Sequence, residues 1–138
     1  MLGAYKVVKK CSSISGSIMK YFIYPRLNLS ERYGKGSWAL ITGASDGLGK
    51  QYALELAREG FNIVLMGRNV QKTAAASKEI RTATNVDTKM LIFDFAKLET
   101  EEAAMELKSL LDQLDVDISI LANNCGVLHF GRLGDRDI

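Results

Sequence analysis

Closely spaced glycines form the part of this sequence that most clearly indicates a chemical function. They lie in the run Thr42-Gly43-Ala44-Ser45-Asp46-Gly47-Leu48-Gly49, which follows the apolar segment 38–41. A glycine turn between a strand and a helix leaves backbone N–H groups free to bind an anion, and the helix dipole favours a phosphate there. The run therefore predicts a phosphate-binding turn, with a purely structural glycine turn as the alternative.

Three of these glycines have distinct predicted roles. Gly43 allows the tight turn, Gly47 lets the backbone approach a pyrophosphate, and Gly49 lets the helix and the strand pack closely. The residues of this run predicted to bind a dinucleotide cofactor are Gly43, Ser45, Asp46, Gly47, Leu48 and Gly49. Lys50 either adds favourable charge beside the phosphates or is simply exposed.

Arg68, at the end of the second predicted strand, bears on which dinucleotide binds. NAD sites place a carboxylate there to accept a hydrogen bond from the ribose 2′-hydroxyl, and NADP sites avoid it. Here the chain reads Gly67-Arg68-Asn69, without an acid. A guanidinium forms charge-assisted hydrogen bonds with a phosphate, so the pattern predicts NADP(H) as the cofactor. A solvated arginine at a helix start is the alternative.

These residues need a scaffold that brings the ends of several strands together. Short apolar runs predict strands at 38–41, 61–66, 90–93 and 118–122, and helices are expected between them at 47–58, 69–83 and 100–114. Near-continuous apolar strands that alternate with helices indicate a parallel sheet with both faces covered. The predicted fold is α/β, a partial Rossmann-like parallel sheet of βαβαβαβ topology with strand order 3-2-1-4.

Apolar spacing predicts which helix faces are buried. In the first helix, Leu48, Tyr52 and Leu56 recur at four-residue spacing with Ala53 and Ala57 beside them, which predicts a stripe that packs against the sheet. In the last helix the expected buried stripe consists of Leu107, Leu111 and Leu114.

Basic residues are concentrated at the start of the chain. Residues 1–35 hold seven Lys and Arg and one acid, so the remainder carries a net charge of −4 within a total of +2. We expect two parts: 1–35, a basic amphipathic segment, and 36–138, a partial NADP-binding domain. The first 30 residues predict a membrane-surface helix or a transit peptide, with a frayed extension as the alternative. Nothing resembles a nucleic-acid-binding motif or a metal-ligand cluster.

A second motif, Asn123-Asn124-Cys125-Gly126, follows the fourth predicted strand. Together with the glycine run it resembles the short-chain dehydrogenase/reductase family, whose members carry Thr-Gly-x-x-x-Gly-x-Gly after the first strand and Asn-Asn-x-Gly after the fourth. The resemblance implies cofactor contacts at Asp94, Asn123 and Gly126, with Asp94 bonding the adenine amino group and Asn123 supporting the sheet centre. Asp94 is also credible as a turn residue.

The segment Tyr33-Gly34-Lys35-Gly36-Ser37-Trp38, leading into TGASDGLGK and FNIVLMGRN, extends the resemblance over about residues 33–128. It looks like the membrane-associated branch that includes very-long-chain 3-oxoacyl-CoA reductases and 17β-type hydroxysteroid dehydrogenases. This resemblance implies NADPH-dependent reduction of a 3-oxoacyl thioester or a ketosteroid in lipid metabolism, at the endoplasmic reticulum membrane. The basic, acid-poor beginning of the chain leaves a mitochondrial location as the alternative.

The catalytic residues of that family are not found here. Its active-site Asn, Ser and Tyr-x-x-x-Lys belong to later strands and helices, and the single Tyr-x-x-x-Lys spacing, from Tyr5 to Lys9, precedes the first strand. We therefore expect no catalytic residue in this chain. Cys125 stands where the family commonly has Ala or Val, and it is interpreted as a small packed side chain.

Three functions remain open at this point. The chain is the cofactor-binding half of a reductase, a catalytically inactive nucleotide-binding or assembly subunit, or a truncated gene fragment. Ile118, Ile120 and Leu121 of the fourth strand would form an uncovered apolar edge, which predicts a protein partner that covers it.

Overall fold

The computed structural model describes residues 28–126, and the first and last segments of the chain lie outside this range. The described elements, in chain order, are α2 (Leu29–Tyr33), β1 (Trp38–Thr42), α3 (Gly47–Arg58), β2 (Asn62–Gly67), α4 (Val70–Thr84), β3 (Thr88–Ile92), the 3-10 turn η1 (Phe95–Lys97), α5 (Glu101–Asp112) and β4 (Ile118–Ala122). Strands and helices alternate from β1 onward, as the apolar spacing predicted.

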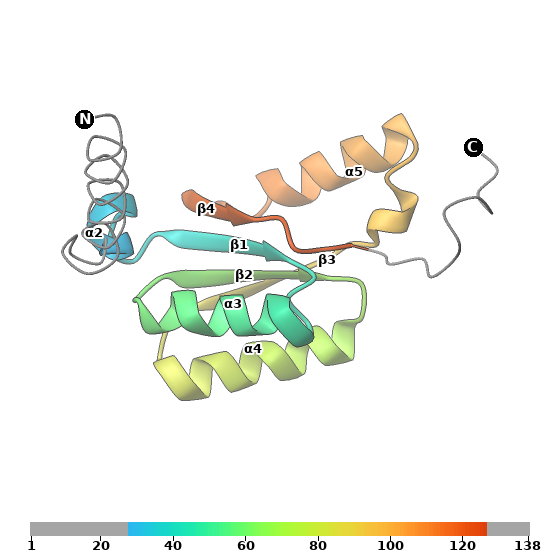
Figure 1. Ribbon diagram of the computed structural model, residues 1–138. Coiled ribbons are helices and arrows are strands. Elements are labelled where there is room, and N and C mark those ends of the chain that lie inside the picture. Colours follow the sequence, from blue (N-terminus) through green and yellow to red (C-terminus); the bar gives the residue numbers. More distant parts are fainter. Residues whose placement is uncertain (1–27, 127–138) are drawn as a thin grey trace, which may run out of the picture.

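The four strands form one parallel sheet in the order β3-β2-β1-β4, which confirms the predicted topology (Figure 1). β3 begins and ends slightly earlier than its hydropathy suggested. Its register against β2 pairs Ile63 with Thr88 and Gly67 with Ile92. Backbone pairing with a neighbouring strand therefore sets the bounds of β3, and the apolar run alone does not.

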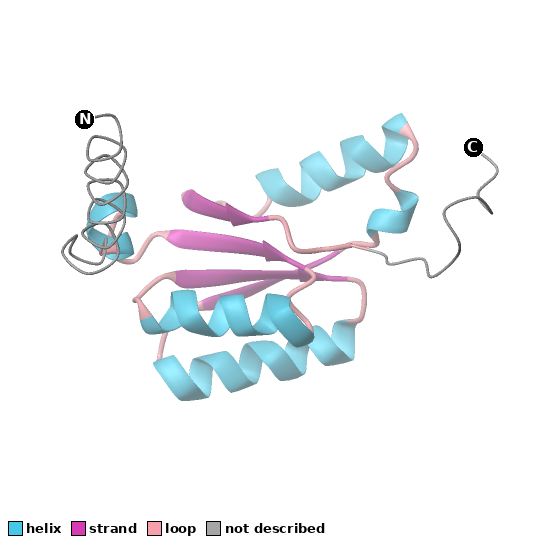
Figure 2. Ribbon diagram, viewed as in Figure 1, coloured by secondary structure: helices cyan, strands magenta, loops and turns pink. Residues whose placement is uncertain are grey.

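Helices cover both faces of the sheet. α3 and α4 lie on one face and α5 on the other, as Figures 1 and 2 show. Each face has its own apolar core. Under α3 and α4 the fully buried side chains include Ile41, Phe61 and Leu65, and under α5 they include Leu40 and Val64. Alternate residues of β1 and β2 thus supply opposite cores.

The helix starts are set by side-chain caps. Asp46, Asn69 and Thr100 each accept a hydrogen bond from a backbone N–H in the first turn of α3, α4 and α5, respectively. Asn69, the first residue of the helix predicted at 69–83, is thus the cap of α4. Gly60 has a φ of 90°, which allows the chain to leave α3 and enter β2.

The predicted buried stripe of α3 is wrong in part. Leu48 and Tyr52 are 72% and 54% exposed, whereas Gly49, Ala53 and Ala57 are buried. The small residues bring the helix axis close to the sheet, and the large ones are left on its flank. For the last helix the outcome agrees better: Leu114, two residues beyond the end of α5, is buried, and the other two leucines are partly buried against the same core.

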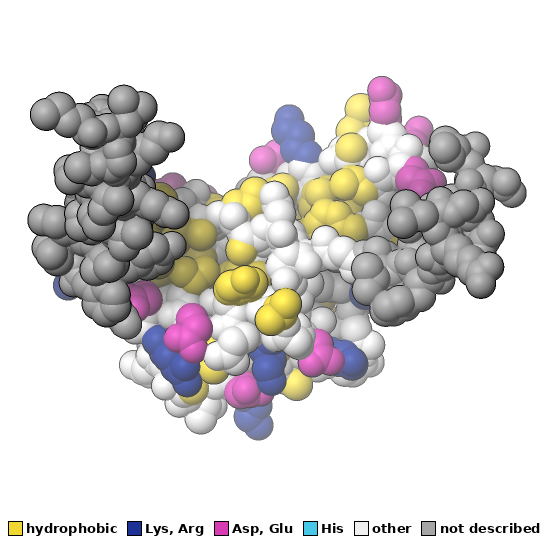
Figure 3. Space-filling model, in the orientation of Figure 1, with side chains coloured by type: hydrophobic (Ala, Val, Ile, Leu, Met, Phe, Trp, Pro, Cys, Tyr) yellow, Lys and Arg dark blue, Asp and Glu magenta, His cyan; other side chains and the backbone are white. Residues whose placement is uncertain are grey.

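β4 forms an edge of the described sheet and is less covered than β1 or β2. Its residues are partly exposed, and Leu121 is 60% exposed. Beside it an apolar groove is lined by Leu29, Tyr52, Leu56 and Ala122 together with two glutamates. Figure 3 shows hydrophobic side chains gathered between α3 and α5, where β4 lies.

The predicted membrane-surface or targeting segment falls mostly on residues 1–27, outside the described range. Its helical character and the division of the chain at residue 35 stay predictions. Among residues 28–126, no helix has the length and apolar character needed to cross a bilayer.

The packing of α3 predicts opposite outcomes for two substitutions on this helix. Ala53→Leu adds volume at a fully buried position and should lower the free energy of unfolding by about 1–3 kcal/mol. Leu48→Ala removes an exposed side chain and should change it by less than about 0.5 kcal/mol. Urea unfolding followed by circular dichroism measures both. A larger loss of unfolding free energy for Leu48→Ala than for Ala53→Leu would instead support the buried stripe that the spacing predicted.

Candidate functional site

The candidate site lies where the parallel strands end. The segments after β1, β2, β3 and β4 converge at this edge of the sheet, opposite the end at which α2 lies (Figure 1). Together they line one cleft, whose residues are Gly43, Ser45, Gly67, Arg68, Phe93, Asp94, Phe95, Ala96, Cys125 and Gly126. Five of the ten site residues predicted from the sequence line this cleft, namely Gly43, Ser45, Arg68, Asp94 and Gly126.

The glycines allow backbone segments to meet at this edge. Gly43 turns with a φ of 67°. A Cβ at Gly49 would lie 2.3 Å from the Gly43 carbonyl oxygen and 2.5 Å from Nδ2 of Asn124, which leaves no room for a side chain. A Cβ at Gly47, by contrast, would meet nothing within 4 Å. The backbone at Gly47 therefore faces open space, as it must if a ligand is to approach it.

Thr42 joins the ends of β1 and β4. Its buried hydroxyl accepts hydrogen bonds from the backbone N–H groups of Asn124 and Cys125, both at 2.9 Å, and it lies 3.4 Å from the carbonyl oxygen of Ala122. The Asn124 side chain donates to the carbonyl oxygens of Thr42 at 3.2 Å and Gly43 at 3.5 Å. These contacts fix the second motif against the glycine turn.

Asn123, which the family resemblance implied would support the sheet centre, is exposed. The supporting contacts come from the next residue, Asn124. The two asparagines are adjacent and chemically identical, so the motif alone could not distinguish them. The alternation of side chains along the strand, continued beyond Ala122, was the sequence signal that could have distinguished Asn124 from Asn123.

Asp46 caps α3 and also bonds to α4. Its Oδ1 accepts from the Gly47 backbone N–H at 2.8 Å, and its Oδ2 lies 3.1 Å from Nζ of Lys72. The hydrogen bond from Lys72, reinforced by the bond from Gly47, lowers the pKa of Asp46 below its ordinary value. The sequence placed Asp46 in the glycine turn but gave no sign of its partner Lys72.

Arg68 is exposed at the rim of the cleft and makes no ion pair with any residue from 28 to 126. It also borders a neighbouring hollow with Asn69, Asp94 and Lys97. A guanidinium without a carboxylate partner at a strand end is available for an anionic ligand. This position agrees with the role predicted for Arg68.

Asp94 has the turn role that the sequence left open. Its carboxylate accepts from the Ala96 backbone N–H at 3.2 Å and so caps η1. Phe93 and Phe95 on either side pack edge to face, with ring centroids 5.5 Å apart. The cap holds Asp94 at the cleft.

Cys125 corrects a sequence-based interpretation. It was expected to be a small packed side chain, but it is exposed and lines the cleft. Its backbone is the buried part, because its N–H bonds to Thr42.

The cleft has the features of a dinucleotide-binding site. The glycine turn leads into α3 at this edge of the sheet, and the backbone at Gly47 faces open space. In open α/β sheets, ligands bind at the carboxyl ends of the strands where the strand order reverses, which here is between β1 and β4. Fold and cleft together define a Rossmann-type dinucleotide-binding domain.

Comparison with known proteins identifies the family. The family model described as short chain dehydrogenase matches residues 37–137, and the chain belongs to this family.

Curated relatives share one name. A very-long-chain 3-oxoacyl-CoA reductase of Coccidioides immitis (strain RS) is 42% identical over 128 residues, which cover 92% of this chain and 36% of that protein. The enzyme of the same name from Meyerozyma guilliermondii is 38% identical over 94% of this chain and 37% of its own length. The chain thus spans little more than a third of the relatives it matches.

Solved structures agree in fold. A 7β-hydroxysteroid dehydrogenase superposes with a TM-score of 0.64 at 31% identity, covering 80% of this chain and 40% of that one. A short chain dehydrogenase of Escherichia coli CFT073, solved with NADPH, gives a TM-score of 0.62 at 29% identity over 68% of this chain and 39% of its own.

The two asparagines of the second motif provide a matched test of the site's support. Asn124→Ala removes the side-chain bonds to the Thr42 and Gly43 carbonyls and should lower the free energy of unfolding by about 1 kcal/mol. Asn123→Ala alters an exposed side chain and should leave it within about 0.5 kcal/mol. Thermal unfolding measures both, and the reverse order would contradict the assignment to Asn124.

Proposed function

We propose that this chain supplies the NADP(H)-binding part of a short-chain dehydrogenase/reductase. The observation that supports this most strongly is Arg68 at the end of β2, which lies in the same cleft as the glycine turn and makes no ion pair with residues 28–126. A positive side chain there complements a 2′-phosphate, and the residues 67–69 offer no carboxylate to a ribose 2′-hydroxyl.

The described residues would hold the cofactor in three places. The backbone around Gly47, at the N-terminus of α3, would bind the pyrophosphate. Arg68 would bind the 2′-phosphate, and Asp94 would accept from the adenine amino group. Ser45 and Gly126 border the same cleft, while the exposed Asn123 lies just before it in the chain.

The reaction is inferred from the relatives. The cofactor, when bound, supplies hydride to a carbonyl carbon. We propose a 3-oxoacyl thioester as the substrate, because the relatives at 38–43% identity are named very-long-chain 3-oxoacyl-CoA reductases. A ketosteroid is the second candidate, favoured by the likeness to a 7β-hydroxysteroid dehydrogenase. Residues 28–126 bind and orient the cofactor in this proposal, and none is assigned a proton transfer.

The cofactor preference can be tested by calorimetric titration with NADPH and NADH. We expect tighter binding of NADPH, and Arg68→Ala should weaken it by about 10- to 100-fold, because a hydrogen bond to a charged group contributes about 1.5–3 kcal/mol. NADH binding should change less than about threefold in the same variant.

Arg81→Ala is the matched control, since it removes the same side chain from the last turn of α4. It should leave both affinities unchanged. Equal binding of NADPH and NADH by the parent chain would refute the assignment of Arg68, and binding of neither would refute the proposed function.

We also propose a protein partner at the edge of β4. The strand carries apolar residues toward both cores, with Ile120 and Ala122 on one face and Ile118 on the other, which is the pattern of an interior parallel strand. The relatives contain far more polypeptide than the matched part. The proposed occupant is the remainder of such a domain, which would add a strand beside β4.

An uncovered apolar edge should cause self-association when the chain is purified alone. Leu121→Lys places a charge at a 60% exposed position and should reduce that association with little effect on the melting temperature. Light scattering over a concentration series measures the first quantity and calorimetry the second. A parent chain that is monomeric, protease-resistant and cooperative in melting would rule out the need for a partner.

The proposed location is the endoplasmic reticulum membrane, in keeping with the lipid substrate in the relatives' name. It rests on the family resemblance and on the basic charge of residues 1–35.

A further inference from the structure

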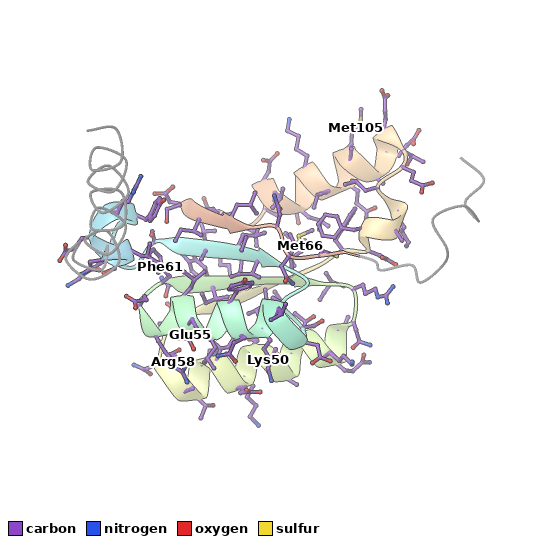
Figure 4. All side chains as sticks on the ribbon, in the orientation of Figure 1. Lys50, Glu55, Arg58, Phe61, Met66 and Met105 are labelled. Atoms are coloured by element: carbon purple, nitrogen blue, oxygen red, sulfur yellow. The ribbon has the colours of Figure 1, made fainter. Side chains whose placement is uncertain are left out.

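Two ion pairs join α3 to α4, and they differ in their distance from the cleft. Lys72 of α4 bonds to Asp46 at 3.1 Å, at the N-terminal ends of both helices. Lys50 of α3 bonds to Glu79 of α4 at 3.0 Å, and Figure 4 shows Lys50 on the side of α3 next to α4. Glu79 is two helical turns beyond Lys72, or about 10 Å along the axis. The first pair therefore lies at the helix ends next to Ser45 and Arg68, which line the cleft, and the second lies farther from the cleft.

Lys72 belongs to the same turn of chain as Arg68. The Asn69 side chain accepts from the Lys72 backbone N–H at 2.9 Å, so the cap that starts α4 also fixes Lys72 just beyond Arg68. The Lys72 side chain is 61% exposed and can therefore reorient. A second cation thus follows Arg68, the residue proposed to bind the 2′-phosphate, by four positions in the chain.

Asp46 places a negative charge in the same region. Its carboxylate is held from two sides, by the Gly47 backbone and by Lys72. An unpaired carboxylate there would repel a phosphate that carries up to two negative charges. Lys72 offsets this charge, so the pair contributes little net charge, and Arg68 makes no ion pair with any residue from 28 to 126.

We propose that the Asp46–Lys72 pair sets the strength of the preference for a 2′-phosphorylated dinucleotide, with Lys72 as a second specificity-determining residue that Asp46 restrains. The proposal rests on the proposed function. It assigns opposite effects to the two partners: loss of Lys72 exposes the carboxylate to the phosphate, whereas neutralisation of Asp46 releases Lys72 toward it.

The test measures NADPH and NADH affinities of the full chain and its variants by calorimetric titration. Lys72→Gln should weaken NADPH binding about fivefold, and Asp46→Asn should strengthen it by a similar factor, as expected for exposed charge pairs. NADH affinity should change less than about twofold in both. Asn preserves the N-cap of α3, and Lys72→Arg should retain the affinity of the parent chain.

Glu79→Gln is the matched control for Asp46→Asn, because it removes the same charge from the other pair between these helices. It should leave the NADPH to NADH ratio unchanged. The selective effects at Lys72 and Asp46 should also diminish as salt is added, since salt screens exposed charges.

Several results would overturn the proposal. If Lys72→Gln lost affinity equally for NADPH and NADH, Lys72 would have a merely structural role. If the NADPH to NADH affinity ratio were unchanged in both variants, the Asp46–Lys72 pair would not determine cofactor specificity. If Glu79→Gln changed the NADPH to NADH affinity ratio as much as Asp46→Asn, the effect would come from the net charge of the protein and not from the Asp46–Lys72 pair. Failure of the proposed function is distinguished by the parent chain itself, which would then bind neither cofactor or both equally.

Discussion

The close contact between the end of β1 and the start of α3 determines the rest of the structure. The Gly49 Cα approaches the Gly43 carbonyl so closely that a Cβ would lie 2.3 Å from its oxygen. This contact allows α3 to lie against the sheet through glycine and alanine, and it directs the helix N-terminus toward the strand ends. The Thr42 hydroxyl and the Asn124 side chain then fasten the end of β4 to the same turn.

The contact explains the chemistry of the cleft. Because α3 is packed so closely, its free N–H groups and its dipole act at the strand ends, where a phosphate is stabilised. Arg68 enters the same cleft from β2 without a carboxylate partner in the described part of the chain. Asp46, the residue that caps α3, is itself neutralised by Lys72. The positive potential of the cleft thus depends on helix position as well as on side-chain charge.

The sequence predicted the strand order and half of the residues that line the cleft, because these follow from local patterns such as apolar runs and short motifs. It failed where the answer depended on tertiary geometry. Spacing alone could not decide which side of α3 is buried, because the large side chains that begin with Leu48 and the small ones that begin with Gly49 both recur at helical intervals. Likewise, Lys72 and Asp46 are 26 positions apart in the sequence, so no local sequence pattern indicates their ion pair.

The central claim is that NADP(H) binds across the carboxyl ends of the strands, with its 2′-phosphate at Arg68. Amide and guanidinium NMR shifts of the ¹⁵N-labelled chain during titration with NADPH test this most directly. We expect the largest shifts in the amides of residues 45–49 and in the Arg68 guanidinium. NADH should reproduce the amide shifts of residues 45–49 but not the shift of the Arg68 side chain. Shifts centred on α2 and the opposite end of the sheet would contradict it.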